Sequence, residues 1–271
     1  ILYPDALVHQ YRQIQGSTVE YYQLLQLILA FMMLTLPGLA AAAGAGPHLD
    51  KANIDLTDKA SLQRGARLFV NYCLNCHSAS FMRYKRMGDD LGIPDKLVEE
   101  NLLFTTDKIR EPMKVAMTAE DAGNWFGTAP PDLSVMARAK GSGNEGANWL
   151  YTYFRSFYID ESRPFGVNNT VFKDVGMPHV LWELQGMQTL VNAEELAKHA
   201  SAKPEFALNQ PGSMSADEYD QAARDLTNFM VYMGEPAQLE RKSLGIWVAL
   251  FLIFFFFIAY ALKKEYWKDI H

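Results

Sequence analysis

The sequence predicts a mainly helical fold that ends in a membrane-spanning helix. Apolar side chains recur at helical spacing along one early segment, at Leu62, Ala66, Phe69, Val70 and Cys73. A second segment, residues 214–233, has the same spacing and opens with Ser215 and Glu218 in a capping-box pattern. The third observation is residues 244–262, a run of 19 residues without a charge. That length suffices for a helix to cross a bilayer.

The remaining segments add shorter elements. Thr57 or Asp58 is the expected cap of the first helix. Residues 148–159 are rich in aromatic side chains and are predicted to be helical. The acidic stretch 89–121 is expected to form loops and short helices, and residues 166–178 form a loop punctuated by Gly, Asn and Pro.

Length and charge limit the classes of function. The chain has 271 residues, of which 49% are hydrophobic, enough for one large domain or two small ones with a buried core. Its formal net charge is −6. An acidic balance argues against nucleic acid as a partner.

An apolar stretch near the N-terminus precedes this domain. Residues 24–43 are apolar except for Gln26, Thr35, Pro37 and Gly38, and they end in a run of alanines. This pattern resembles a secretory signal with a small-residue cleavage site. We expect an uncleaved signal that acts as an anchor at about residues 22–43, within an N-terminal segment 1–46; a cleaved signal is the alternative.

The stretch Cys73-Leu74-Asn75-Cys76-His77 carries the chemistry. Two cysteines three positions apart with a following histidine are typical of c-type haem attachment, in which two thiols add to the two vinyl groups and the imidazole binds the iron. Half of a zinc site and a thioredoxin-like redox pair are the alternatives. The chain has only 2 Cys, which excludes four-sulfur zinc sites and allows one haem only.

These features predict three segments and an orientation. Residues 47–236 form the haem domain, and residues 237–271 carry the membrane helix and a short tail. Because haem is attached to c-type cytochromes outside the cytoplasm, we expect the haem domain in the bacterial periplasm and the C-terminus in the cytoplasm. Lysines that follow the apolar run slightly outnumber the basic residues before it, so charge alone decides little.

A second axial ligand is expected for an electron carrier. Met177 lies in the loop motif Gly176-Met177-Pro178, where glycine permits a close approach of the backbone to a flat ring. Met214 and His179 are the alternatives. A thioether ligand raises the reduction potential relative to a second histidine.

Taken in order, several motifs resemble the cytochrome c1 family, the haem subunits of quinol–cytochrome c oxidoreductase (bc1) complexes, in their proteobacterial form. The resemblance covers about residues 47–271. The motifs are Cys73-x-x-Cys76-His77, Ala129-Pro130-Pro131-Asp132-Leu133-Ser134, Arg163-Pro164-x-Gly166-Val167-Asn168-Asn169, Gly176-Met177-Pro178 and Lys263-Lys264-Glu265-Tyr266-Trp267-Lys268.

The resemblance implies an all-α, cytochrome-c-like haem domain with long loop insertions, plus the C-terminal transmembrane helix. It implies one covalently bound haem c, with His77 and Met177 as the iron ligands. The positions that match haem-contacting residues of the family are Pro131, Arg138, Lys140 and Trp149. Lys140 stands where a second arginine is expected, and lysine lacks the bidentate fork of arginine. Trp149 has core packing as its alternative role.

The same resemblance implies a function. We expect a subunit of a dimeric inner-membrane complex that takes electrons from the Rieske iron–sulfur protein, contacts cytochrome b and passes electrons to a c-type cytochrome, with no substrate catalysis on this chain alone. A membrane-anchored cytochrome that serves an oxidase or dehydrogenase is one alternative, which co-purification with cytochrome b tests. A haem sensor is another, and ready binding of carbon monoxide to the reduced protein would indicate it.

Overall fold

The structure is a computed structural model that describes Gln26 and residues 46–268. The chain divides into two units, Ile1–Gly46 and Pro47–His271. The anchor expected at about residues 22–43 lies outside the described residues, apart from the single helical residue Gln26. The description below therefore concerns residues 46–268.

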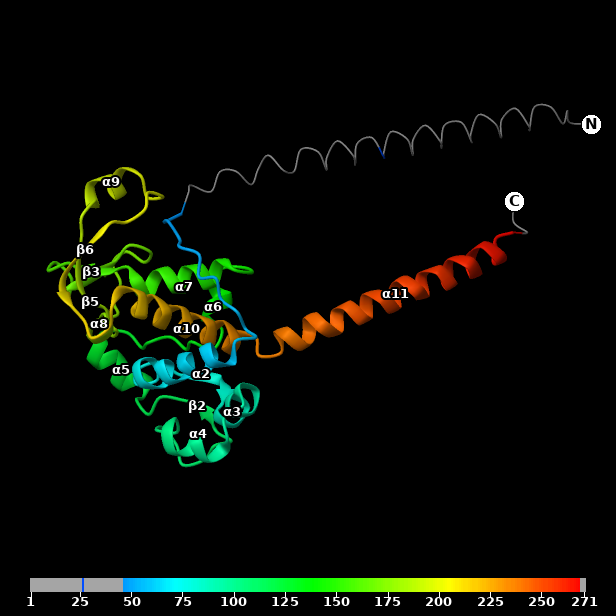
Figure 1. The fold of residues 1–271 in the computed structure, drawn as a ribbon, viewed down its shortest axis with the longest axis horizontal. Coiled ribbons are helices and arrows are strands. Elements are labelled where there is room, and N and C mark those ends of the chain that lie inside the picture. Colours follow the sequence, from blue (N-terminus) through cyan, green and yellow to red (C-terminus); the bar gives the residue numbers. More distant parts are fainter. Residues whose placement is uncertain (1–25, 27–45, 269–271) are drawn as a thin grey trace, which may run out of the picture. The chain divides into compact units, whose positions relative to one another are not determined.

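Three helices form the centre of the domain that precedes the apolar C-terminal helix. Helix α2 (Lys59–Leu68) is capped by Asp58, one of the two caps that the sequence predicted; its carboxylate accepts a hydrogen bond from the Ser61 N–H at 3.0 Å. Helix α7 covers Glu145–Arg155, and helix α10 covers Ala216–Gly234. The predicted capping box at the start of α10 is confirmed, because Ser215 and Glu218 each bond the backbone N–H of the other. Helix α10 packs against α2, against α7 and against the short helix α6 (Met136–Ala139) (Figure 1).

Shorter helices occupy the connections between these three. Helices α3 (Tyr84–Leu91), α4 (Asp95–Asn101) and α5 (Ala119–Phe126) follow the haem motif, so the prediction of short helices within residues 89–121 is confirmed. Helices α8 (Trp182–Gln185) and α9 (Ala193–Lys198) precede α10.

Three two-stranded antiparallel sheets also form, so the expectation of a purely helical fold was too narrow. Strand β1 (Ala79–Arg83) pairs with β2 (Pro112–Met113), β3 (Phe157–Ile159) with β4 (Val167–Asn169), and β5 (Gly186–Leu190) with β6 (Phe206–Pro211). The helix predicted for 148–159 ends at Arg155, because residues 157–159 pair with β4. Short strands in long connections satisfy backbone groups that a loop would leave unpaired.

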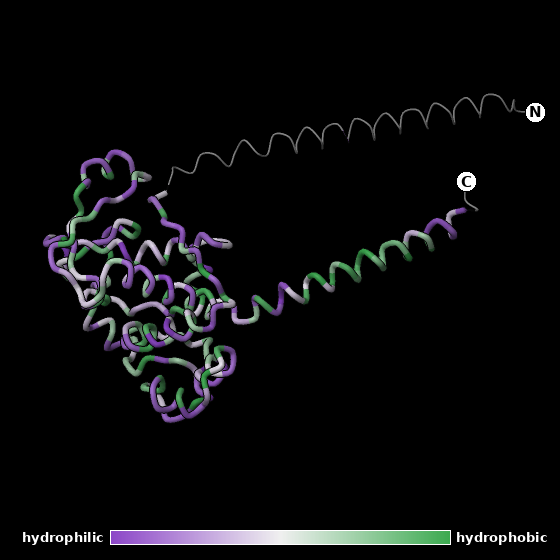
Figure 2. The backbone as a smooth tube through the Cα atoms, in the orientation of Figure 1, coloured by the Kyte–Doolittle hydropathy of each residue, from purple (hydrophilic) through white to green (hydrophobic). Residues whose placement is uncertain are grey.

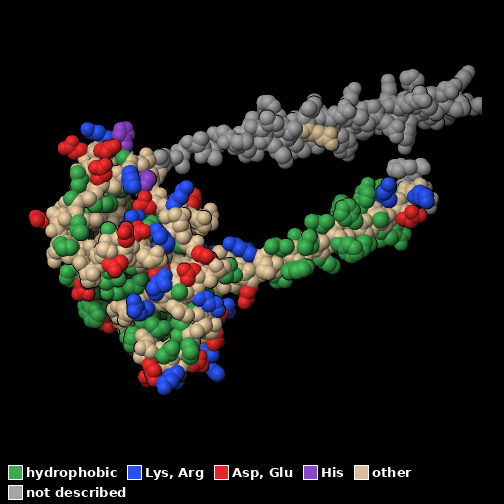
Figure 3. Space-filling view, viewed as in Figure 1, with side chains coloured by type: hydrophobic (Ala, Val, Ile, Leu, Met, Phe, Trp, Pro, Cys, Tyr) green, Lys and Arg blue, Asp and Glu red, His purple; other side chains and the backbone are tan. Residues whose placement is uncertain are grey.

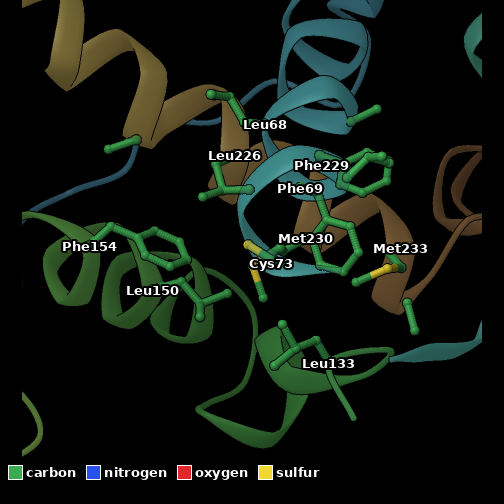
Figure 4. Packing of buried hydrophobic residues seen from close by; sticks show 14 of the residues in the cluster. Leu68, Phe69, Cys73, Leu133, Leu150, Phe154, Leu226, Phe229, Met230 and Met233 are labelled. Carbon is green, nitrogen blue, oxygen red and sulfur yellow. The ribbon is translucent and has the colours of Figure 1, made fainter. Parts of the chain in front are cut away.

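The close crossing of α2 and α10 organises the core. Gly65 of α2 faces the backbone of α10, so that a Cβ added there would lie 2.1 Å from the Asp225 carbonyl oxygen. One turn further, Phe69 packs on Phe229 with ring centroids 5.4 Å apart. Figure 4 shows these rings beside Cys73, with Leu226 and Met230 of α10 and Leu150 of α7 nearby.

The last helix has a different character. Helix α11 (Gln238–Tyr266) has 29 residues, none of them buried, and among the described helices it is the one long and apolar enough to cross a membrane. Its hydrophobic middle is flanked by hydrophilic ends in Figure 2, and apolar side chains cover it in Figure 3. At 1.5 Å per residue, the uncharged run spans about 28 Å, close to the thickness of the hydrocarbon core.

Replacing Gly65 with alanine should destabilise the domain that contains α2 and α10. The added methyl group meets backbone atoms of α10 that cannot move without separating the two helices. We expect Gly65→Ala to reduce the free energy of unfolding by about 1–3 kcal/mol, the usual cost of overpacking. Thermal unfolding of the full chain in detergent, followed by circular dichroism, measures the effect.

Gly123 in α5 provides the matched control, because a Cβ built there has nothing within 4 Å. Gly123→Ala should leave the unfolding midpoint unchanged or raise it slightly. Equal midpoints for Gly65→Ala and the wild type would contradict the close crossing.

Candidate haem site

The haem motif lies where α2 widens into a π-helical turn, η2 (Phe69–Cys73). The Leu74 N–H then bonds the Phe69 carbonyl at 3.0 Å, and the N–H groups of Cys76 and His77 both bond the Cys73 carbonyl, at 3.1 and 2.9 Å. This tight turn reverses the chain directly after the helix. It brings both thiols and the imidazole to one side, although the sequence did not predict the π-turn.

That side is a pocket of about 370 Å³. This volume lies in the range of cofactor and ligand sites. Seven of the eight residues predicted to contact a haem line the pocket, namely Cys73, Cys76, His77, Pro131, Lys140, Trp149 and Met177. The eighth, Arg138, is not in the lining.

The ring of His77 is oriented by a backbone carbonyl. Its Nδ1 lies 2.8 Å from the Pro131 oxygen, which can only accept a hydrogen bond, so Nδ1 carries the proton. The other ring nitrogen, Nε2, is then unprotonated and has a lone pair for a metal. Burial lowers the pKa of His77, although the Pro131 carbonyl and Asp132 oppose this shift. The imidazole is therefore neutral at physiological pH, the form that binds metals.

Asp132 holds the segment that carries this carbonyl. Its carboxylate accepts hydrogen bonds from the backbone N–H of Ser80 at 2.9 Å and of Ser134 at 2.8 Å. Burial disfavours the charged form, but the hydrogen bonds from Ser134 and Ser80 outweigh it and lower the pKa of Asp132. The ionised carboxylate thus joins the chain after the haem motif to the Pro130-Pro131 segment.

Cys73 has the properties of an inert thiol. Cys73 is buried among core side chains (Figure 4), and desolvation, with a smaller effect of Cys76, raises the pKa of Cys73 to about 12. A zinc ligand or a redox thiol needs the thiolate, which this environment disfavours. Within residues 46–268, no group of three or more His, Cys, Asp and Glu is arranged to hold a metal ion.

Of the three candidates for the second axial ligand, the structure brings one to the pocket. Met177 is half-buried and lines it together with Gly176 and Pro178. Met214 is not in the lining and packs against the core instead. His179 is also outside the lining; it is buried, and its ring stacks on Phe157 with centroids 4.9 Å apart.

Of the two basic residues predicted to contact the haem, one lies at the pocket and the other does not. The Lys140 Nζ lies 4.3 Å from the ring centroid of Trp149 and 5.1 Å from that of Phe172, so a cation sits on aromatic faces at the pocket. Arg138 lies beside Gly234 at the end of α10, where a Cβ built on Gly234 would be 3.6 Å from the Arg138 Cγ. Trp149 lines the pocket and also packs against the core, so its predicted alternative of core packing is confirmed and its contact with a haem stays a prediction.

Several lining residues were absent from the sequence predictions. They are aromatic, apolar or small side chains such as Tyr72, Phe126, Met136, Tyr153, Phe172 and Met230. Tyr153 alone carried a usable signal, because it follows Trp149 by four positions and so lies on the same face of α7. Its ring stacks on that of Trp149 with centroids 4.9 Å apart and an angle of 12°.

Comparison with known proteins relates this pocket to a family. The family model described as the cytochrome C1 family matches residues 100–270. A cytochrome c1 of Allochromatium vinosum is 49% identical over 249 residues, covering 91% of this chain and 99% of that protein. The chain belongs to the cytochrome c1 family. More distantly, it is 26% identical to a cytochrome c1 of Rhodospirillum rubrum over 90% of this chain and 96% of that protein.

Another relative has a different name. A Nitrosomonas europaea protein called ammonia monooxygenase gamma subunit is 46% identical over 90% of this chain and 97% of its own length. The cytochrome c1 family accounts for the function of the present chain, which is that of a haem electron-transfer subunit of a bc1 complex. Cytochrome b and the Rieske protein are the companion subunits that the family implies, and α11 fits a membrane anchor.

Neutralising Asp132 should weaken the domain in a pH-dependent way. We expect Asp132→Asn to lower the free energy of unfolding by about 1 kcal/mol at pH 7, a low value because the carboxylate is partly exposed. The folded-state pKa lies below the ordinary 3.8. The stabilisation is therefore fully present above about pH 4 and disappears as the pH falls through the depressed value.

The thermal unfolding midpoints of the wild type and of Asp132→Asn, each at pH 7 and at pH 3, measure this loss of stability and its pH dependence. Asp107→Asn is the control, because Asp107 forms no hydrogen bond or ion pair with another described residue. A gap between Asp132→Asn and the wild type that is as large at pH 3 as at pH 7 would contradict the role of the ionised carboxylate.

Proposed function

We propose that the pocket holds one haem c, attached covalently through Cys73 and Cys76, with His77 and Met177 as the axial ligands of the iron. The observation that carries this proposal is the lining of the pocket. Two thiols, an imidazole and a thioether from segments about 100 residues apart meet in a single apolar pocket.

The chemistry of this donor set fits the cofactor. Cys73 and Cys76 supply the two thiols for thioether bonds, with the buried Cys73 thiol in its uncharged form, and His77 presents a neutral imidazole whose orientation is fixed by Pro131. Bound haem supplies one-electron chemistry between ferric and ferrous iron. The apolar side chains around it exclude water and disfavour the additional charge of the ferric state, and the Met177 thioether acts in the same direction.

The haem propionates need a polar or basic neighbour at the edge of the pocket. Lys140 supports this role, because it lies at the pocket and its position is fixed by Trp149 and Phe172. Pro131 contributes a carbonyl to His77 and a flat apolar surface to the pocket. Arg138, which lies beside Gly234, is a weaker candidate for a propionate contact.

The wider arrangement follows from the family and the apolar helix. We propose that residues 47–236 form a periplasmic haem domain of cytochrome-c-like fold with long insertions, and that residues 237–271 anchor it with the C-terminus in the cytoplasm. Residues 1–46 carry the proposed second anchor. In this arrangement the Rieske protein reduces the haem, and a c-type cytochrome accepts the electron, within a dimeric inner-membrane complex. Lys263 and Lys264 at the end of α11 support a cytoplasmic end for that helix.

Replacing Met177 tests the iron ligation. Leucine fills the same space but has no sulfur, so Met177→Leu should lower the reduction potential and allow carbon monoxide to bind the reduced protein. Redox titration and absorption spectra of the purified complex with and without carbon monoxide measure both effects. Met214→Leu is the matched control and should behave as the wild type. An unchanged potential and spectrum in Met177→Leu would remove Met177 from the iron.

An acidic stretch supports a basic acceptor. Residues 89–121 contain nine acidic and four basic side chains. Five of these acids form ion pairs with basic side chains. The pairs are Lys85 with Asp89 and with Asp95, Arg86 with Asp90, Lys96 with Glu100, and Lys108 with Glu111. Within the described residues, Glu99, Asp107, Glu120 and Asp121 form no ion pair. Glu120 and Asp121 lie on α5, which also supplies Phe126 to the pocket. Arg110 and Lys114 of the same stretch also form no ion pair within the described residues, so the unpaired side chains leave a negative balance on the stretch that leads to the pocket.

Charge reversal tests this docking surface. Long-range attraction raises association rates and is screened over about 10 Å at 0.1 M salt. The rate of electron transfer to a basic soluble c-type cytochrome should therefore fall steeply as salt rises. The triple variant Glu99→Lys, Asp107→Lys and Glu120→Lys should be slower at low salt and lose most of this dependence.

The control reverses three acids of the connection between β5 and β6, namely Glu194 and Glu195 on α9 and Glu205 just before β6, and should keep the wild-type salt dependence. If the first triple variant also keeps it, the stretch 89–121 is not the docking surface.

A further inference from the structure

The hydroxyl of Tyr153 points at the sulfur of Met177. The Tyr153 oxygen lies 3.3 Å from the Met177 Sδ and donates a hydrogen bond to it. A thioether is a weak acceptor, and a buried tyrosine usually selects a stronger one. Among the described residues, however, this sulfur is the only hydrogen-bond partner of the Tyr153 hydroxyl. The contact therefore needs an explanation beyond ordinary satisfaction of a buried polar group.

The ring that carries this hydroxyl is held by two aromatic neighbours, and its backbone is held by a hydrogen bond. Trp149 stacks on one face, and Phe157 meets the ring edge-on with centroids 5.1 Å apart. The Tyr153 carbonyl also accepts a hydrogen bond from the Asn169 side chain at 2.8 Å, which fixes the backbone. Tyr153 has only 8% of its surface exposed. The direction of its hydroxyl is thus set by the scaffold and not by the Met177 loop.

The hydroxyl remains a donor under all physiological conditions. A phenol ordinarily has a pKa of about 10 and so stays protonated at physiological pH. A thioether sulfur has two lone pairs, of which one can bind a metal while the other accepts a hydrogen bond. Donation to the second lone pair withdraws electron density from the first. A weaker sulfur donor stabilises ferric iron less, and the ferrous state is favoured.

We propose that Tyr153 is a positioning residue that raises the reduction potential of the bound haem by donating a hydrogen bond to the Met177 sulfur. This inference rests on the proposed ligation of iron by Met177. Hydrogen bonds to ligand atoms are among the means by which proteins adjust metal potentials. The role differs from that of the lining residues that only exclude water.

Tyr153→Phe tests the proposal, because it removes the hydroxyl and keeps the ring between Trp149 and Phe157. At a fixed ambient potential, the ratio of ferrous to ferric haem should fall by about three- to tenfold, as for the loss of one hydrogen bond. For a one-electron couple this is a downward shift of about 28 to 59 mV. The readouts are redox titration of the purified complex and its haem absorption spectrum, which should still show a six-coordinate haem.

Tyr219→Phe is the matched control. Tyr219 is also buried, and its hydroxyl donates to the Phe154 carbonyl at 2.7 Å, so the variant loses a buried hydrogen bond that does not involve the sulfur. Its potential should equal that of the wild type. An equal fall in both variants would show a general loss of packing and would overturn the proposal. Loss of haem from Tyr153→Phe alone would do the same, since it would assign Tyr153 a structural role.

A double variant distinguishes the role of Tyr153 from the ligation of iron by Met177. When Met177→Leu has already removed the sulfur, Tyr153→Phe should cause no further change in potential. If Met177→Leu alters the spectrum and Tyr153→Phe leaves the potential unchanged, the ligation stands and the role of Tyr153 is overturned. If Met177→Leu alters neither potential nor spectrum, the ligation itself fails, and the role of Tyr153 fails with it.

Discussion

The contact between α2 and α10 is the constraint on which the haem site depends. Gly65 lets the two backbones approach closely, and the Arg64 guanidinium donates to both carboxylate oxygens of Asp225 at 2.6 and 3.0 Å beside it. Because Cys73 follows two turns later on the same axis, this crossing fixes the point from which the haem motif starts. A larger residue at position 65 would move that point relative to α7 and α10, which supply the opposite wall of the pocket.

The pocket itself is assembled by the connections between helices. The segment around Pro131 reaches His77, and the segment around Met177 closes the other side. Each is fastened by polar contacts outside the pocket, such as the hydrogen bonds from Ser80 and Ser134 to Asp132. The lining is therefore mostly apolar, with Lys140 and Thr128 among its few polar side chains besides His77. Polar contacts outside the pocket thus help to fix its geometry, as a carrier that changes charge without changing shape requires.

Charges are distributed differently on the surface and at the pocket. Most acids of the stretch 89–121 are neutralised by neighbours along the chain, since Lys85 bridges Asp89 and Asp95. Figure 3 shows acidic and basic side chains interspersed over the visible face of the domain. At the pocket, Lys140 lies over the aromatic ring of Trp149 and has no acidic partner within the described residues. A single unpaired cation there favours an anionic group at the edge of the pocket.

The sequence alone determined the motif at Cys73–His77, the helices that begin at Asp58 and Ser215, and the apolar run of α11, because spacing and capping are local properties. It also placed Met177 among three candidates. Only the tertiary structure showed that Met177 and Lys140 line one pocket while Met214, His179 and Arg138 lie outside it, and only the tertiary structure showed the hydrogen bond from Tyr153. Those outcomes depend on which side chains the packing of α2, α7 and α10 brings together across about 100 residues, and neither periodicity nor spacing encodes such long-range contacts. The three small sheets were missed for the same reason, since each strand is defined by its partner.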